Sequence, residues 1–204
     1  METKGEIEAL IGALRHPEAC SEAQKALIEI GALAVPLIIN ALRDRDISLA
    51  ATEVLREIGA VAVEPLSAAL GNKNKSVSAY AALVLEDIGP PSVEPLISAL
   101  TSKDRRTRIF TVRALGNIGD DRAVGPLTSF FNESALFDKE GALLAVTIES
   151  LRKLGKIVVK PGETSLQRGG TRKRARKTQK LLLEFVEELE NKGKIEAQSR
   201  NLVE

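Results

Sequence analysis

The chain has 204 residues, of which 44% are apolar, 28% are charged and only 3% are aromatic, with no Trp. A chain of this balance builds an aliphatic core, and Leu, Ile, Val and Ala favour helix packed on helix. The formal net charge of +1 combines 19 basic and 21 acidic residues in 1–160 with 10 basic and 7 acidic residues in 161–204, so the basic excess belongs to the end of the chain.

Cys20 is the only cysteine, which excludes an intrachain disulfide. No apolar run approaches the roughly 18 residues that a membrane span needs. The first residues lack the basic and apolar regions of a secretory signal. We therefore expect a soluble, cytoplasmic protein.

One sequence motif recurs along the chain at a nearly fixed period. Such a period indicates a repeat architecture and takes precedence over local patterns. Four copies have an apolar residue and Gly, followed some residues later by Pro and Leu, and a fifth, weaker copy ends at Leu154-Gly155. The glycines are Gly31, Gly59, Gly89, Gly119 and Gly155, at steps of 28, 30, 30 and 36, and the prolines are Pro36, Pro65, Pro95 and Pro126.

The Gly and the Pro of the motif each have a physical reason for their position. A Gly in left-handed conformation ends a helix, and Pro is tolerated in the first turn of the next helix, where its missing N–H costs nothing. After Pro36 an apolar helix is expected to end at the charged turn 43–46. A second helix then follows, with a stripe at Ile47, Ala50, Ala51, Val54, Leu55 and Ile58.

The other second helices repeat this stripe. It reads Val77, Tyr80, Ala81, Val84, Leu85 and Ile88 in one repeat, and Thr107, Phe110, Thr111, Ala114, Leu115 and Ile118 in the next. The sequence therefore predicts an all-α fold, an α-α superhelix of the HEAT or armadillo type, with about five helical hairpins and a further C-terminal amphipathic helix. The longer last step predicts an insertion around residues 131–140.

The residues over 104–127, above all the run from Val112 to Val124 followed by Pro126-Leu127, resemble the short HEAT-like repeat first named for phycobilisome lyases. The resemblance covers about residues 4–155 and implies a solenoid that binds other molecules. The Asp and Arg that open the second helix in this family are both present only as Asp104 and Arg108, which argues against a continuous ladder of such pairs between repeats.

The same fold family includes bilin lyases and an alkylpurine DNA glycosylase, so both activities remain alternatives. Both would be expected to line a groove with aromatic residues, and this chain has one Tyr and no Trp. We expect no catalytic residue, no metal and no cofactor. His16 is the only histidine, and Cys20 has no other His or cationic cluster near it, so each is read as a structural or solvated residue.

We expect the solenoid to occupy residues 1–158, a linker 159–170, a basic and then amphipathic helix 171–192, and a tail 193–204. The amphipathic segment has an apolar stripe at Leu181, Leu182, Phe185, Val186 and Leu189. It is predicted to cap the last repeat, because the ends of repeat arrays need a polar outer face. Dimer formation and binding in the groove of another protein remain alternatives.

Seven cations without an acid occupy 13 residues before this stripe, namely Arg168, Arg172, Lys173, Arg174, Arg176, Lys177 and Lys180. Such a run is able to contact phosphates of a nucleic acid. However, no aromatic residues alternate with the cations for base stacking, and Glu184, Glu187, Glu188 and Glu190 follow at once. A solvated linker is the favoured reading and nucleic-acid binding the alternative. A membrane partner is not expected, because these acids would repel an anionic surface.

Second helices line the concave face of HEAT-like stacks, and the positions beside the apolar stripe are expected to point into that groove. They are Leu49, Thr52, Glu53, Arg56, Ala79, Ala82, Leu83, Glu86, Ile109, Val112 and Arg113. Their apolar members would form a ladder with a charged edge, typical of a contact surface; the alternative is that they pack within the stack. The prediction is a non-catalytic scaffold or adaptor that holds a peptide or helix of another protein.

Overall fold

The computed structural model describes residues 4–137 and 142–155, and all regular structure in these ranges is helical. The predicted all-α fold is confirmed. The α-helices are α1 Lys4–Ala13, α2 Pro17–Ile30, α3 Val35–Ala41, α4 Ser48–Ile58, α5 Val63–Ala69, α6 Lys75–Ile88, α7 Val93–Ala99, α8 Arg105–Ile118, α9 Val124–Phe137 and α10 Ala142–Lys153. Short 3-10 helices are η1 Gly31–Leu33, η2 Gly59–Ala62, η3 Pro90–Ser92 and η4 Asp121–Ala123. Among residues 4–137 and 142–155, we find no helix that combines the length and the hydropathy of a membrane span.

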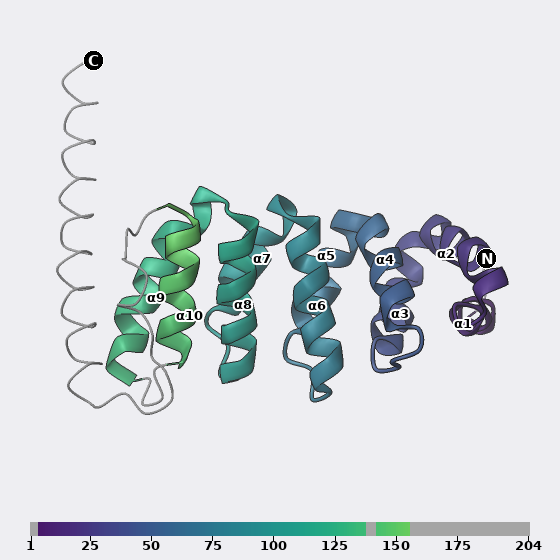
Figure 1. The fold of residues 1–204 in the computed structure, drawn as a ribbon, viewed down its shortest axis with the longest axis horizontal. Coiled ribbons are helices and arrows are strands. Elements are labelled where there is room, and N and C mark those ends of the chain that lie inside the picture. Colours follow the sequence, from purple (N-terminus) through teal and green to yellow (C-terminus); the bar gives the residue numbers. More distant parts are fainter. Residues whose placement is uncertain (1–3, 138–141, 156–204) are drawn as a thin grey trace, which may run out of the picture. The chain divides into compact units, whose positions relative to one another are not determined.

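The chain forms two compact units, Met1–Ala123 and Val124–Glu204. In the first unit the helices pair as α1 with α2, α3 with α4, α5 with α6 and α7 with α8. Second helices contact the next second helix, so α4, α6 and α8 stand side by side (Figure 1), and first helices contact the next first helix. In the second unit α9 packs against α10. Each hairpin of the first unit therefore contacts its neighbours in the chain, as the repeat predicts.

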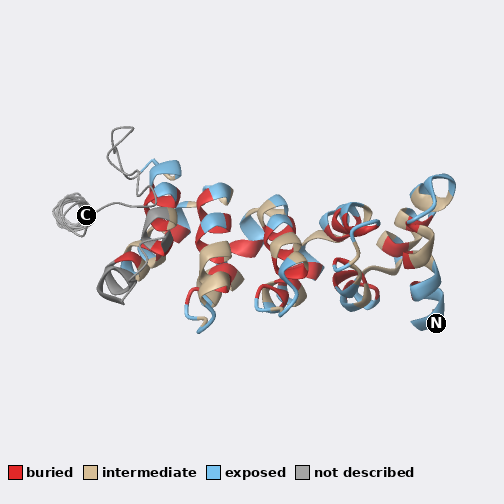
Figure 2. Cartoon of the chain, turned by 60° about the horizontal axis from the view of Figure 1, so that its bottom comes forward, coloured by how far each residue is buried: buried red, intermediate tan, exposed pale blue. Residues whose placement is uncertain are grey.

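The core of the first unit follows the repeat position by position. The residue four places before each glycine is fully buried, as Leu27, Leu55, Leu85 and Leu115. Figure 2 shows buried residues along the helix sides that face neighbouring helices, with exposed residues on the outside. In α3 the buried position is Ile38, and Leu37 is only half-buried, because Pro36 follows its glycine one residue sooner than Pro65 and Pro95 follow theirs.

The helix-ending glycines all have positive φ, from 63° to 77°. The backbone N–H groups of Gly31, Gly59, Gly89 and Gly119 donate to the carbonyl four residues earlier. Only Gly119 has the expected left-handed ψ, 17°. The first three have ψ between −126° and −133°, because the chain turns at once into a 3-10 helix, which the sequence pattern did not predict.

The longer last repeat is partly explained by its first helix. α9 has 14 residues, whereas α3, α5 and α7 have seven each. Part of the predicted insertion at 131–140 thus extends this helix. Residues 138–141 lie outside the described part of the chain.

Candidate partner-binding face

Every second helix of the first unit leaves one stripe open to solvent. It contains the residues that lie ten, six and two places before the glycine, so its members are four residues apart and share one helix side. We call these stripes together the open face. Its members are Ser21, Lys25 and Glu29 on α2, Leu49, Glu53 and Glu57 on α4, Ala79, Leu83 and Asp87 on α6, and Ile109, Arg113 and Asn117 on α8; Ala79 and Ile109 are half-buried and the others are exposed.

The predicted groove residues divide into three groups in the structure. Leu49, Glu53, Arg56, Leu83 and Arg113 are exposed, and Ala79, Glu86 and Ile109 are half-buried. Thr52, Ala82 and Val112 are buried, with exposed fractions of 7%, 2% and 0%. The first two groups remain available to a partner.

The inclusion of Thr52, Ala82 and Val112 in the groove was wrong. All three lie seven residues before the glycine, beside the α4–α6 and α6–α8 contacts, where small or β-branched side chains fill the interior. The Thr52 hydroxyl donates to the Ser48 carbonyl at 2.7 Å, which satisfies it within its own helix. The predicted apolar ladder is therefore interrupted, and Leu49 and Leu83 are its most exposed members.

The open face changes in chemistry from one edge to the other. The row ten residues before the glycine consists of Ser21, Leu49, Ala79 and Ile109 and is mostly apolar. The row two residues before the glycine contains Glu29, Glu57 and Asp87 in three successive repeats, all exposed. Sequence reasoning missed this acidic row, although aligning the chain on Ile-Gly reveals it. The face thus has an apolar edge and an acidic edge.

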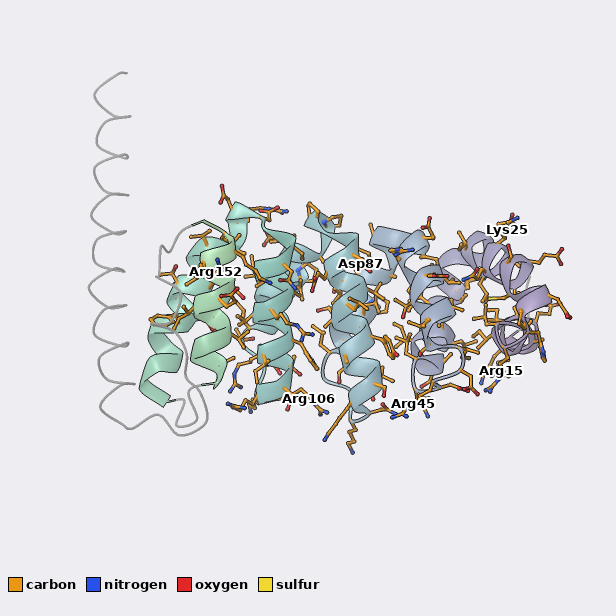
Figure 3. All side chains as sticks on the ribbon, viewed as in Figure 1. Arg15, Lys25, Arg45, Asp87, Arg106 and Arg152 are labelled. Carbon is orange, nitrogen blue, oxygen red and sulfur yellow. The ribbon has the colours of Figure 1, made fainter. Side chains whose placement is uncertain are left out.

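The acidic edge lies at the C-terminal ends of α2, α4 and α6, as the label of Asp87 in Figure 3 shows for α6. Carbonyl groups give this end of a helix a partial negative charge, so a carboxylate there adds to that charge. Between the two edges Glu53 accepts a hydrogen bond from the Gln24 amide at 2.8 Å, which joins α2 to α4. The face over α2, α4 and α6 is consequently negative along one side.

α8 differs from the other second helices, because it carries four arginines and no acid. The Arg113 guanidinium lies 5.3 Å from the centre of the Phe110 ring, a cation–π contact on the open face. Arg106, labelled near the start of α8 in Figure 3, lies 4.0 Å from the Asp104 carboxylate. Arg108 donates to the carbonyls of Ser102 and Lys103. The open face therefore carries a cation and no carboxylate at α8, whereas Lys25 on α2 is accompanied by Glu29.

Asp104 and Arg108 act within their own repeat. Asp104 caps α8 by accepting hydrogen bonds from the Thr107 hydroxyl at 2.7 Å and the Thr107 N–H at 3.0 Å. These two bonds hold the pKa of the Asp104 carboxyl below its usual value, and the bond from the Thr107 hydroxyl has the larger effect. Neighbouring hairpins are joined by other contacts, including Arg15 with Asp44, Ser48 with Tyr80 at 3.1 Å and Arg122 with the Pro90 carbonyl at 3.0 Å.

The chemical candidates do not assemble into a site. His16 is exposed immediately before α2, and Cys20 is half-buried one turn later. No three residues of the types that bind metal cluster in the described ranges. A cavity of about 540 Å³ lies along α5 and α7, on the first helices and away from the open face. Glu64, Glu94 and small side chains line much of it.

Two exposed apolar side chains lie outside the predicted face. Leu33 in η1 and Val61 in η2 have exposed fractions of 70% and 58%. Each is two residues after a helix-ending glycine, and η1 contacts η2. The apolar residue at this position was the available signal for them.

The predicted C-terminal features lie outside the described residues. These are the linker 159–170, the cations from Arg168 to Lys180, the apolar stripe from Leu181 to Leu189 and the tail 193–204. They remain predictions from the sequence.

A sequence profile of HEAT repeats matches residues 63–147, from the start of α5 into α10. No curated protein matches the chain. Among solved structures it is similar to two engineered proteins from the Northeast Structural Genomics Consortium. One is 22% identical with a TM-score of 0.42, over 90% of this chain and 97% of the other. The second is 21% identical with a TM-score of 0.42, over 90% of this chain, which spans 58% of that protein. The repeat match and the glycine-ended hairpins support a HEAT-like repeat protein.

Proposed function

We propose that this protein is a non-catalytic scaffold or adaptor, and that the open face of α2, α4, α6 and α8 binds a peptide or helix of another protein. The observation that carries the proposal is the exposure of Leu49 and Leu83, at 68% and 42%. Both lie on the open face, on the adjacent helices α4 and α6. Large apolar side chains on a shared surface are typical of contact sites. The alternative that these two leucines pack within the stack does not fit their exposure.

The chemistry of the remaining surface agrees with a binding role. The exposed His16 lies immediately before α2, whereas the Tyr80 hydroxyl lies 3.1 Å from the Ser48 Oγ, an interaction between repeats. The Tyr80 hydroxyl therefore has a structural role between repeats. A cytoplasmic location and the short phycobilisome-lyase type of repeat belong to this proposal, supported by the single cysteine and by the repeat residues around 104–127.

The proposal is tested by the double variant Leu49→Asp, Leu83→Asp. Proteins captured by the wild-type chain in a pull-down and identified by mass spectrometry should be lost, because two charges would replace the apolar contact. The melting temperature should change little, since both side chains are exposed.

Leu33→Asp is the matched control, because Leu33 is equally exposed but lies outside the open face. It should keep every partner that the wild type captures. Retention of the same partners by the Leu49, Leu83 double variant would refute the open face as the binding surface. A collapse of its melting temperature would place these leucines in the core and refute the proposal as well.

A further inference from the structure

The two edges of the open face are complementary to two different types of side chain in a partner, apolar at one edge and cationic at the other. The apolar row presents Leu49, with Ala79 beside it on the next helix, and the acidic row presents Glu29, Glu57 and Asp87. The structure pairs none of these three carboxylates with a cation among the described residues. The negative charge of this edge is therefore not neutralised by neighbouring side chains of the first unit.

The position of the acids is unfavourable for the helices that carry them. Each is the last residue but one of its helix, where the backbone carbonyls already present partial negative charge and a cation would be preferred. One such residue needs no explanation, but the same choice occurs in three successive repeats. A cationic group of a partner, placed along this edge, would turn the unfavourable arrangement into a favourable one.

The dimensions of the open face match a helix laid across it. The two rows are eight residues apart along each second helix, which corresponds to about 12 Å at 1.5 Å per residue. An α-helix with its side chains is about 10–12 Å wide. Adjacent packed helices lie about 8–10 Å apart, close to the rise of seven helical residues, about 10.5 Å. A crossing helix would thus meet successive carboxylates with every seventh residue.

The fourth repeat limits the cationic stretch. Asn117 stands on α8 in place of the acid, so the acidic row ends there. In the middle row Arg113 on α8 has a counterpart in Lys25 on α2, whereas α4 and α6 carry Glu53 and Leu83. A lysine or arginine of a partner would meet no carboxylate of the row at α8, only the nearby positive charge of Arg113, whereas at α2 it would meet Glu29. The acidic edge therefore extends over three helices only.

We infer that the segment bound by the open face is a cationic amphipathic helix of another protein, lying across α2, α4 and α6 with apolar side chains toward Leu49 and Lys or Arg at about every seventh position toward Glu29, Glu57 and Asp87. This inference rests on the proposed function, because it assigns the chemistry of the partner that the same face binds. It goes further in fixing the charge, the spacing and the extent of the contact.

The test uses two synthetic helical peptides of about 21 residues with identical leucine stripes. One carries Lys at every seventh position along its polar edge, and the other carries Glu at the same places. Fluorescence anisotropy measures their binding to the full chain. The Lys peptide should bind, with an affinity that falls as salt is added, and the Glu peptide should bind at least about tenfold more weakly.

Three single variants of the full chain sharpen the result. Asp87→Asn should weaken binding of the Lys peptide by about threefold to fivefold, the value of one exposed ion pair, while leaving the melting temperature unchanged or higher. Arg113→Glu should strengthen it, because it extends the acidic surface onto α8. Glu64→Gln is the control, since Glu64 is an exposed carboxylate on the first helix α5. It should leave the affinity within about twofold.

Equal binding of the two peptides, or an Asp87→Asn effect no larger than that of Glu64→Gln, would overturn the inference. So would an absence of Lys-peptide binding. In each of these cases the proposed function is judged separately: it stands if Leu49→Asp, Leu83→Asp abolishes partner capture and fails if that variant captures the same proteins. A doubled mass in light scattering that Asp87→Asn returns to the monomer would identify a second copy as the occupant, which also overturns the inference.

Discussion

Gly59 shows how one residue decides where a helix ends. Its φ of 69° and ψ of −133° form a conformation that side chains with a Cβ rarely adopt. Apart from its two chain neighbours, no residue has an atom within 4 Å of a Cβ built there, so crowding by the surrounding structure is not the limitation. We predict that Gly59→Ala lowers the free energy of unfolding by at least about 1–2 kcal/mol through backbone strain alone. Urea denaturation of the variant measures the change.

Gly12 is the matched control, because a Cβ there also meets nothing within 4 Å while its backbone belongs to α1. Gly12→Ala should raise the free energy of unfolding by up to about 0.5–1 kcal/mol, since Ala has less conformational freedom to lose. If both substitutions changed stability in the same direction, positive φ would not be what makes Gly59 necessary.

The residues that could be predicted from the sequence are those whose own backbone limits their conformation. Glycine and proline marked the helix ends because few other residues tolerate these positions. The burial of Thr52, Ala82 and Val112 could not be predicted in the same way. It depends on how far one hairpin is rotated against the next, and no single position carries that information. The acidic row is present in the aligned repeats, but its positions are exposed and lie outside the apolar pattern that predicts the helices.

Helix α8 shows how the start of an element depends on one carboxylate. The Asp104 carboxylate caps the first turn of α8 by accepting hydrogen bonds from the N–H and the hydroxyl of Thr107. We predict that Asp104→Ala lowers the free energy of unfolding by about 0.5–2 kcal/mol at pH 7. Asn74→Ala should cost a similar amount, because the Asn74 amide oxygen accepts from the N–H groups of Ser76 and Val77 at the start of α6.

The two caps should differ in their pH dependence. Because the pKa of Asp104 is lowered in the folded chain, its contribution is fully present above the unfolded carboxyl pKa of about 3.9 and is lost as pH falls through the lower, folded value. The destabilisation by Asp104→Ala should therefore shrink between pH 6 and pH 3, measured against wild type by urea denaturation. That of Asn74→Ala should remain constant, since an amide does not titrate. A constant effect of Asp104→Ala would contradict the role of the ionised carboxylate.

In the first unit as a whole, we expect the stability of each hairpin to depend on its contacts with the neighbouring hairpins. α6 contacts α4, α5 and α8, whereas the main contacts of α1 are with α2 and α3. In an array of this kind each repeat is stabilised by its neighbours, so a local loss spreads outward and weakens with distance. The order of contacts thus predicts the order in which helices lose protection from hydrogen exchange.

Val84→Ala tests this order, because Val84 is fully buried in α6 and its truncation should cost on the order of 2 kcal/mol. Amide hydrogen exchange followed by mass spectrometry should show the largest increase in α5 and α6, a smaller increase in α4 and α8, and the smallest in α1. Ile11→Val, in α1, is the complementary variant and should act mainly on α1, α2 and α3. An equal increase in all helices with either substitution would mean that the first unit unfolds as one cooperative body, with no gradient between its repeats.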